Sequence, residues 1–233
     1  MKSAIALLAL VSMAAPAQDM TQLEWKPKVG EVTKLKFNMA MNVGTDVSVS
    51  FLITSKTTKV EKDEVTTESE MGNFELMVGG QPMDMGGQAP GSGGEKMVTV
   101  HKLNGVLVSD SSPKEMGGGE RMNRMNAFLR PSKPVKIGDF WENEWKADKE
   151  KGLQNSKARW TLAAYEPKNG VDCWKVDYVY AEMDSANGIS ANGSVWISAK
   201  DGGMEYTKYD FQNVSFQDGM PPANGTGTVT RVH

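Results

Sequence analysis

Residues 35–53 read LKFNMAMNVGTDVSVSFLI, and their pattern decides the fold. Apolar side chains occupy every second position in two successive runs, and these positions are Leu35, Phe37, Met39 and Met41, then Val47, Val49, Phe51 and Ile53. Successive side chains of a β-strand point to opposite faces, so a period of two is typical of a half-buried strand. The stretch therefore predicts two strands that each place one apolar face on a core.

Similar alternation and clear turn signals recur along the rest of the chain. Asn-Gly pairs at residues 104–105 and 169–170 stand between apolar runs, and both residue types tolerate the positive φ of tight hairpin turns. Asp-Gly-Gly at residues 201–203 predicts a further hairpin tip. We therefore expect an all-β fold: a curved antiparallel sheet or open barrel of roughly ten strands, with one short helix packed on it.

Residues 119–130 are the segment expected to form that helix. Its apolar positions recur at helical spacing, at Met122, Met125 and Leu129, with Phe128 at the edge of the same face. Pro131 ends the segment because proline cannot continue a helix. We expect this helix to cover the concave side of the sheet.

Two similar segments divide the chain. KPKVGEV at residues 26–32 and KPVKIGDF at residues 133–140 both place glycine and an acid just before a strand run. In each, the glycine permits a tight turn and the preceding aliphatic residue can anchor that turn to the core. We expect one β domain over residues 25–233, made of a first β half (25–110), the helix and a second β half (133–233).

The second of these segments has the spacing Val-x-x-Gly-Asp-x-Trp, formed by Val135, Gly138, Asp139 and Trp141. It resembles a strand start seen in uncharacterised secreted bacterial β-proteins, which look related to the open-barrel folds of lipoprotein carriers. The resemblance implies a curved antiparallel sheet wrapped around helices. It implies no catalytic residues.

The N-terminus has the pattern of an export signal. Lys2 precedes an apolar run over residues 4–15, and Ala15-Pro16-Ala17 offers the small residues that a signal peptidase needs. The run is too short to span a bilayer. We therefore expect a signal peptide over residues 1–17, cleaved near Ala17, then a flexible N-terminus over residues 18–24. The mature protein would be secreted or periplasmic, without a membrane anchor.

Composition argues against several classes of function. The formal net charge is −3 and no basic run stands out, so nucleic acid is not an expected partner. Cys173 is the single cysteine, which excludes an internal disulfide. With two histidines and no recognisable catalytic motif, we expect no enzyme, no catalytic residues and no cofactor.

Methionine placement suggests a binding function. Eleven of the fourteen methionines that follow the signal peptide precede residue 131. Methionine adapts to irregular shapes and is favoured at plastic binding surfaces, although it also serves as ordinary core filler. We expect a non-catalytic binding protein for an apolar small molecule, a lipid or a hydrophobic segment. The candidate ligand-binding residues are Met39, Met41, Met122, Met125, Phe128 and Leu129.

Two other functions stay open. The first is a protein–protein interaction or assembly module of the cell envelope. The second is Cu(I) binding, because soft thioethers select that ion. Met83 and Met85 lie in a glycine-rich stretch over residues 79–94, expected to be a loop, and Met97 and His101 follow it.

We predict that the exported protein begins at Gln18, because Ala15 and Ala17 stand where small residues are required. Mass spectrometry of the exported protein should show the loss of residues 1–17. Detection of an intact Met1, or of a lipid on the new terminus, would contradict this localisation.

Overall fold

The computed structural model describes residues 20–84, 96–111, 119–183, 185, 187–215 and 221–233. The expected signal peptide and most of the glycine-rich stretch lie outside these residues.

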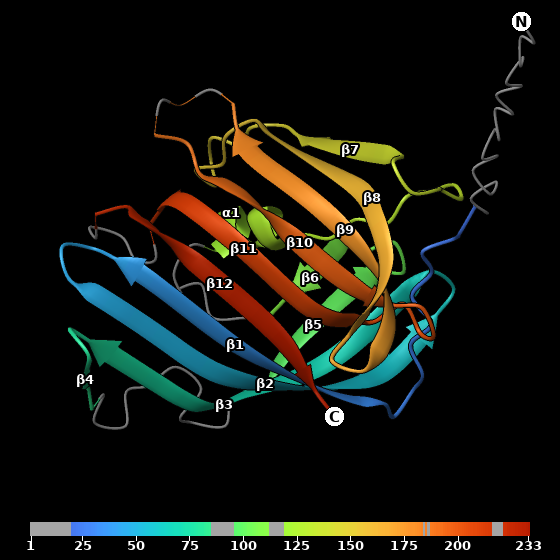
Figure 1. Cartoon of the computed structure of the whole chain (residues 1–233), viewed down its shortest axis with the longest axis horizontal. Helices are drawn as coiled ribbons and strands as arrows, with labels where there is room; N and C mark the ends of the chain where they lie inside the picture. The colour runs from blue at the N-terminus through green and yellow to red at the C-terminus, as the bar shows by residue number, and fades with distance from the viewer. Residues whose placement is uncertain (1–19, 85–95, 112–118, 184, 186, 216–220) are drawn as a thin grey trace, which may run out of the picture.

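The described residues form one antiparallel sheet with a single short helix, α1 (Gly119–Asn126) (Figure 1). This confirms the expected all-β class, with twelve strands where roughly ten were expected. The strands of the first half are β1 (Val32–Asn42), β2 (Asp46–Glu61), β3 (Glu64–Val78), β4 (Gln81–Pro82), β5 (Met97–Lys102) and β6 (Leu107–Asp110). Those of the second half are β7 (Phe140–Trp145), β8 (Ser156–Lys168), β9 (Val171–Glu182), β10 (Ser190–Ser198), β11 (Met204–Val214) and β12 (Ala223–Val232).

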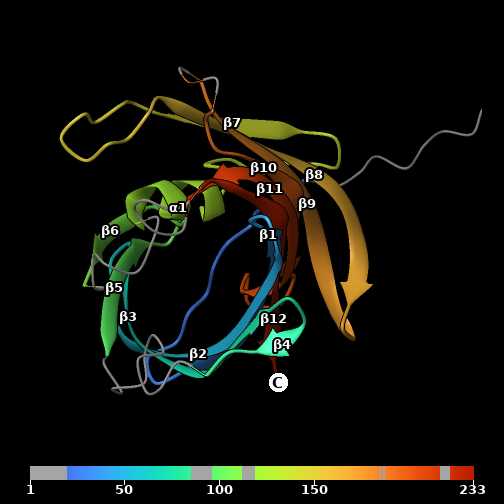
Figure 2. The same cartoon turned by 90° about the vertical axis from the view of Figure 1, so that its left-hand side faces the viewer.

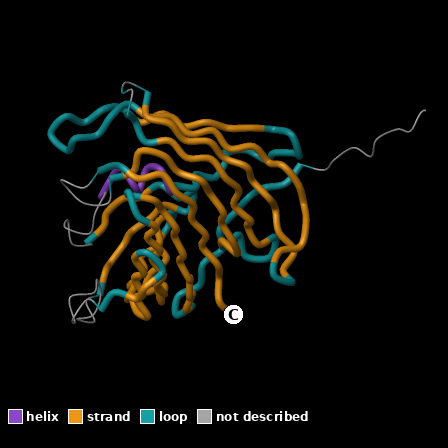
Figure 3. The backbone as a smooth tube through the Cα atoms, turned by 60° about the vertical axis from the view of Figure 1, so that its left-hand side comes forward, coloured by secondary structure: helices purple, strands orange, loops and turns teal. Residues whose placement is uncertain are grey.

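The strand order joins the two halves into one continuous sheet. It runs β6-β5-β3-β2-β1-β12-β11-β10-β9-β8-β7, with β4 paired on the side to β3. The sheet curves into an arc with α1 on its concave side (Figures 2 and 3). Within the described chain, no pairing joins β6 to β7, so the barrel is open.

The hairpin tips expected from the turn signals are confirmed. Residues 104–105 connect β5 to β6, residues 169–170 connect β8 to β9, and residues 201–203 connect β10 to β11.

The segments that precede β1 and β7 fold in the same way. Gly30 has φ +87° and Gly138 has φ +95°, and in each segment the acid after the glycine donates its N–H to the carbonyl three residues back. Positive φ at this position defines a type II turn and favours glycine. Each glycine N–H then bonds at 2.8 Å to the neighbouring strand, to the carbonyl oxygens of Thr57 and Leu162. The short sequence similarity therefore corresponds to one turn geometry used twice.

The hydrophobic core lies on the concave side of the second half. Its largest fully buried side chains include Trp160, Tyr180, Phe211, Met125 and Leu162. Large aromatic rings bury the most area per residue, so they account for much of the packing here. Met125 joins α1 to this core, with 1% of its surface exposed.

The helix is shorter than expected, because α1 ends at Asn126 rather than at residue 130. Backbone groups after it bond to other elements: Arg130 N–H donates to Asn104 O at 2.8 Å, and Leu129 O accepts from the Trp141 indole at 2.6 Å. Pro131 also disfavours a helical conformation of the residue before it. Phe128 and Leu129 therefore lie in a non-helical segment and not on a helix face.

The expectation of a flexible N-terminus is wrong for residues 20–24. Thr21 and Val135 exchange two backbone hydrogen bonds, of 2.7 and 2.9 Å. Leu23 is 2% exposed and belongs to the core, so burial of an apolar side chain fixes this segment.

No helix among the described residues is long and apolar enough to cross a membrane.

Met125→Ala should lower the free energy of unfolding by about 2–5 kcal/mol, because it loses buried contacts and leaves a cavity. Met77→Ala is the matched control: Met77 is 40% exposed, and its loss should cost under about 0.5 kcal/mol. Urea melts of both variants provide the comparison. Equally small losses would mean that α1 contributes little to the core.

Candidate ligand-binding site

The register of the sheet shows which side chains of the first half share a face with the core. Tyr209 and Phe211 are buried in the core. Gly227 and Gly225 lie opposite them on β12, and Met39 and Met41 of β1 lie opposite these glycines. Directly paired residues point to the same side of a sheet, so both methionines lie on the core face, here called the inner face.

The inner face of β1, β2 and β3 presents twelve apolar side chains in four rows of three. The rows are Met41–Val47–Val78, Met39–Val49–Leu76, Phe37–Phe51–Phe74 and Leu35–Ile53–Met71; they follow the cross-strand pairing except at Phe51–Phe74, where the β2–β3 register shifts and the ring contact joins the two residues. All twelve side chains are partly exposed, and none is among the fully buried core residues. We call this set the apolar rows. They extend about 20 Å along the strands and about 10 Å across them, from standard strand spacings.

Phenylalanines form the centre of the apolar rows. The rings of Phe37 and Phe51 stack with centroids 4.8 Å apart and planes 8° apart. Phe51 and Phe74 continue the stack at 6.5 Å and 16°. Three rings from three strands therefore make a continuous aromatic surface on the inner face.

Toward one end of the strands the inner face becomes polar and buried. The hydroxyls of Ser55 and Ser69 lie 2.7 Å apart, as do those of Thr67 and Thr99. Ser69 is 8% exposed and the neighbouring Thr57 is 6% exposed. The exposed apolar surface is thus confined to the part of the strands that lies toward the β1–β2 turn at residues 43–45.

Two segments cross the polar end of the arc, and we call them the floor: residues 20–31 and residues 127–131. Residues 20–31 run from Val135 past the β10–β11 tip, where Lys26 N–H donates to Asp201 O at 2.8 Å, to β2. The β10–β11 tip packs directly against residues 20–31, because a Cβ added to Gly202 would lie 1.7 Å from Glu24 O. The floor therefore connects the ends of strands from both halves.

Arg130 is the unusual residue of the floor. Its Nη2 donates to Gly202 O at 2.7 Å, and its guanidinium lies 5.6 Å from the ring centroid of Trp25 and 5.4 Å from that of Phe128. Nε is buried, and among the described residues it has no hydrogen-bond partner. Burial lowers the pKa of Arg130 to about 10, so the side chain remains a cation at neutral pH.

The positive charge of Arg130 influences the pKa of His101 on β5. Burial is the main cause that lowers its pKa, Arg130 lowers it further, and Asp110 acts in the opposite direction. Both burial and a nearby positive charge disfavour the imidazolium form. The imidazole therefore lies within electrostatic reach of Arg130.

A second arginine near the floor has full ionic partners. Arg231 on β12 contacts Glu31 at 3.2 Å, Asp201 at 3.1 Å and Glu205 at 3.0 Å. Glu205 is 1% exposed and also bonds to His233 at 2.8 Å. These carboxylates are therefore occupied by Arg231 and His233, and Arg130 forms no ion pair with any described residue.

The structure divides the residues expected to bind a ligand. Met39 and Met41 belong to the apolar rows, whereas Met125 is buried in the core and is closed to a ligand. Met122, Phe128 and Leu129 pack against the edge of that core, and Met41 also contacts it.

Two groups of residues escaped the sequence reasoning. The sequence showed Phe37 and Phe51 only as members of two alternating runs. The stack could have been predicted from the alternation, because it places the phenylalanines of neighbouring strands on the same face. No sequence signal marked Arg130, because its neighbours Trp25, Asn104 and Gly202 come from segments that are distant in the chain.

The candidate copper ligands that the structure describes are not brought together. Met83 N–H bonds to Leu76 O, whereas Met97 pairs with Ser69, seven residues further along β3. That separation corresponds to roughly 20 Å. Met85 lies outside the described residues.

Reactive groups are few in the part of the chain that the structure describes. No group of three or more His, Cys, Asp or Glu side chains there could hold a metal ion. Cys173 is fully buried and its thiol donates to Val171 O at 3.3 Å. Burial, aided by the charge of Glu205, raises the pKa of this thiol to about 11, so little thiolate forms at neutral pH.

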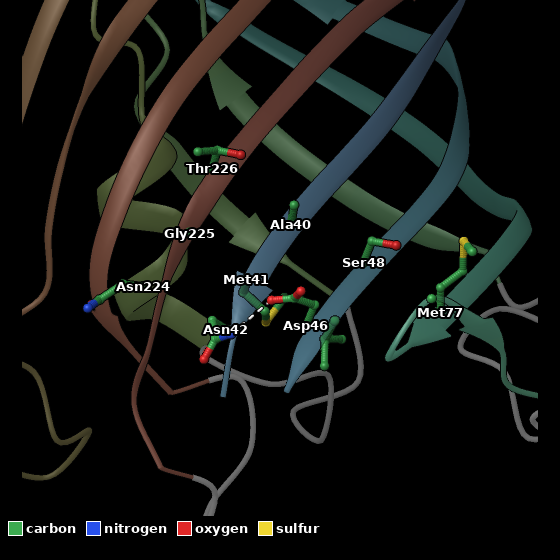
Figure 4. Close-up of a pocket in the computed structure, with 11 residues that line it drawn as sticks. Ala40, Met41, Asn42, Asp46, Ser48, Met77, Asn224, Gly225 and Thr226 are labelled. Atoms are coloured by element: carbon green, nitrogen blue, oxygen red, sulfur yellow. Dashed lines mark hydrogen bonds between the residues drawn. The ribbon is translucent and has the colours of Figure 1, made fainter. Parts of the chain in front are cut away.

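Two shallow depressions of about 490 and 340 Å³ lie along β12, β1 and β2, chiefly over the outer face. Figure 4 shows the first, where Ala40, Ser48 and Thr226 present short side chains and Met77 stands at one side. Asn42 and Asp46 close its end through a 2.8 Å side-chain hydrogen bond. The depressions result from short side chains beside a long one and present no cluster of charged groups.

No protein-family model matches this chain, and a search of curated proteins finds no match.

Arg130→Gln should raise the pKa of His101, because a cation that disfavours the imidazolium is removed. NMR titration can follow it readily, since His101 and His233 are the only two histidines. Arg159→Gln is the control, because Arg159 is half exposed and paired with Glu142 on the edge of the sheet. An unchanged or lower His101 pKa in Arg130→Gln would contradict the placement of the guanidinium.

Proposed function

We propose that this protein is an exported, non-catalytic binding protein for an apolar small molecule, a lipid or a hydrophobic segment of a partner. The ligand would lie on the apolar rows of the first half. The single observation that supports this most strongly is the partial exposure of all twelve apolar side chains on one concave face.

Physical chemistry favours a ligand for such a face. Soluble proteins rarely expose a contiguous apolar patch of more than a few hundred Å², and patches above that size mark sites for ligands, partners or membranes. The opposite, outer face of the same strands has the charged residues Lys34, Lys36, Glu70 and Glu75. The alternation along these strands therefore separates a charged face from an apolar face. A concave surface also encloses more of a small ligand than a flat one does.

In this proposal α1 is a fixed part of the core and does not move to admit a ligand. Arg121 of α1 forms a bidentate ion pair with Glu182 of β9, at 2.6 and 2.8 Å, and Glu182 also accepts the Ile189 N–H. The Glu182 side chain is 1% exposed, so separating the pair would leave a buried charge. Adaptation to a ligand would therefore come from the methionines and stacked rings of the strands.

A docking module is the second candidate function. Valines near the β5–β6 edge are exposed: Val98 by 38%, Val106 by 36% and Val108 by 48%. Within the described chain, β6 pairs only with β5, so its other edge could accept a strand of a partner.

The neutral fluorescent probe N-phenyl-1-naphthylamine should bind the wild-type protein. Phe51→Ala should weaken binding by about two- to tenfold, from the usual strength of aromatic contacts. The matched control is Leu52→Ala, because Leu52 is the next residue of β2 and faces outward. Equal effects of the two substitutions would place the probe elsewhere, and absence of binding by the wild type would favour the docking module.

A further inference from the structure

We propose that Arg130 binds the anionic head group of an amphiphile whose apolar tail lies along the apolar rows. This inference rests on the proposed function and specifies its ligand class.

The first argument is the buried Nε donor of Arg130. A guanidinium has five N–H donors. One of them, on Nη2, bonds to Gly202 O, while the buried Nε has no partner among the described residues. A buried donor without a partner destabilises the fold, and more so when the group is charged. A bound anion would satisfy this donor.

The second argument is the contrast with the other arginines of the described chain. Arg121 pairs with Glu182, Arg159 with Glu142, and Arg231 with three carboxylates. Arg124 donates to two backbone carbonyls. Arg130 combines a buried Nε with the absence of a carboxylate partner. Its two aromatic neighbours lie within cation–π distance, and no described carboxylate forms an ion pair with it.

The third argument is position. Arg130 bonds to Gly202, and a Cβ on the adjacent Gly203 would lie 2.8 Å from Nη1 of Arg231. Arg231 pairs with Leu35, which belongs to the apolar row nearest the floor. Arg130 therefore lies beyond that end of the apolar rows, past the buried side chains of Ser69 and Thr57. The tail of a molecule whose head group binds Arg130 would pass these side chains and then run along the strands over the apolar rows.

The chemistry of the guanidinium favours a planar head group. Arginine binds carboxylates through two parallel N–H···O bonds, and its rigid fork suits this geometry better than a point charge would. The apolar rows extend about 20 Å, which suits a single extended acyl chain. A long-chain fatty acid is the simplest molecule that meets both requirements.

The test compares palmitate with hexadecanol, which have the same tail length and differ in the charge of the head group. Each displaces N-phenyl-1-naphthylamine from the full mature chain. The wild type should prefer palmitate by about tenfold or more, from the usual strength of hydrogen bonds to charged groups. Arg130→Gln should lose this preference while its affinity for hexadecanol stays the same. Arg130→Lys should keep part of the preference, and Arg159→Gln should keep all of it.

The outcomes separate this inference from the proposed function. Equal binding of palmitate and hexadecanol by the wild type would overturn the role of Arg130 and leave an apolar site. Failure of the probe and of both ligands to bind would overturn the proposed function itself.

A measurement on the wild type covers the case in which Arg130→Gln does not fold. NMR of palmitate labelled with carbon-13 at the carboxyl should give a bound pKa below that of the same acid in detergent micelles, because the cation favours the carboxylate. An equal or higher bound pKa would overturn the inference.

Discussion

The seam between β11 and β12 depends on the absence of side chains at two positions. A Cβ at Gly227 would lie 2.2 Å from the ring of Tyr209, and one at Gly225 would lie 2.7 Å from the ring of Phe211. Both rings therefore cross the inner face of β12 and occupy the space where its side chains would be. This close packing extends the second-half core to the strand that pairs with β1, so it joins the two halves of the sheet.

The two halves then differ in what fills their concave side. In the second half, α1 and residues 20–24 cover rings such as Trp160 and Tyr180, and the ion pair between Arg121 and Glu182 holds the helix in place. In the first half, the floor comprises the described segments that cross the strands, and it covers their polar end. The remaining apolar side chains are phenylalanine, methionine and aliphatic residues that are partly exposed. One sheet thus combines a rigid aromatic core with an adaptable apolar surface.

Charge is distributed with the same asymmetry. Glu182 and Glu205 are buried carboxylates, and each is matched by an arginine from another element. Arg130 lies between Trp25 and Phe128 and has no such match among the residues that the structure describes. A buried charge without a partner is destabilising. The concave side of the first half thus has an apolar surface along the strands and a cation beyond one end of it.

The sequence by itself determined the fold class, since period-two alternation and Asn-Gly turns depend only on local chain geometry. It also indicated the turns at Gly30 and Gly138, because a positive φ restricts the residue choice locally. Tertiary structure decided where α1 ends, since Leu129 O and Arg130 N–H bond to Trp141 and Asn104 of other elements instead of continuing the helix. It also decided the candidate site. Alternation places Phe51 on a face but does not state how fully that face is covered, and the surroundings of Arg130 arise from contacts between segments that are distant in the chain.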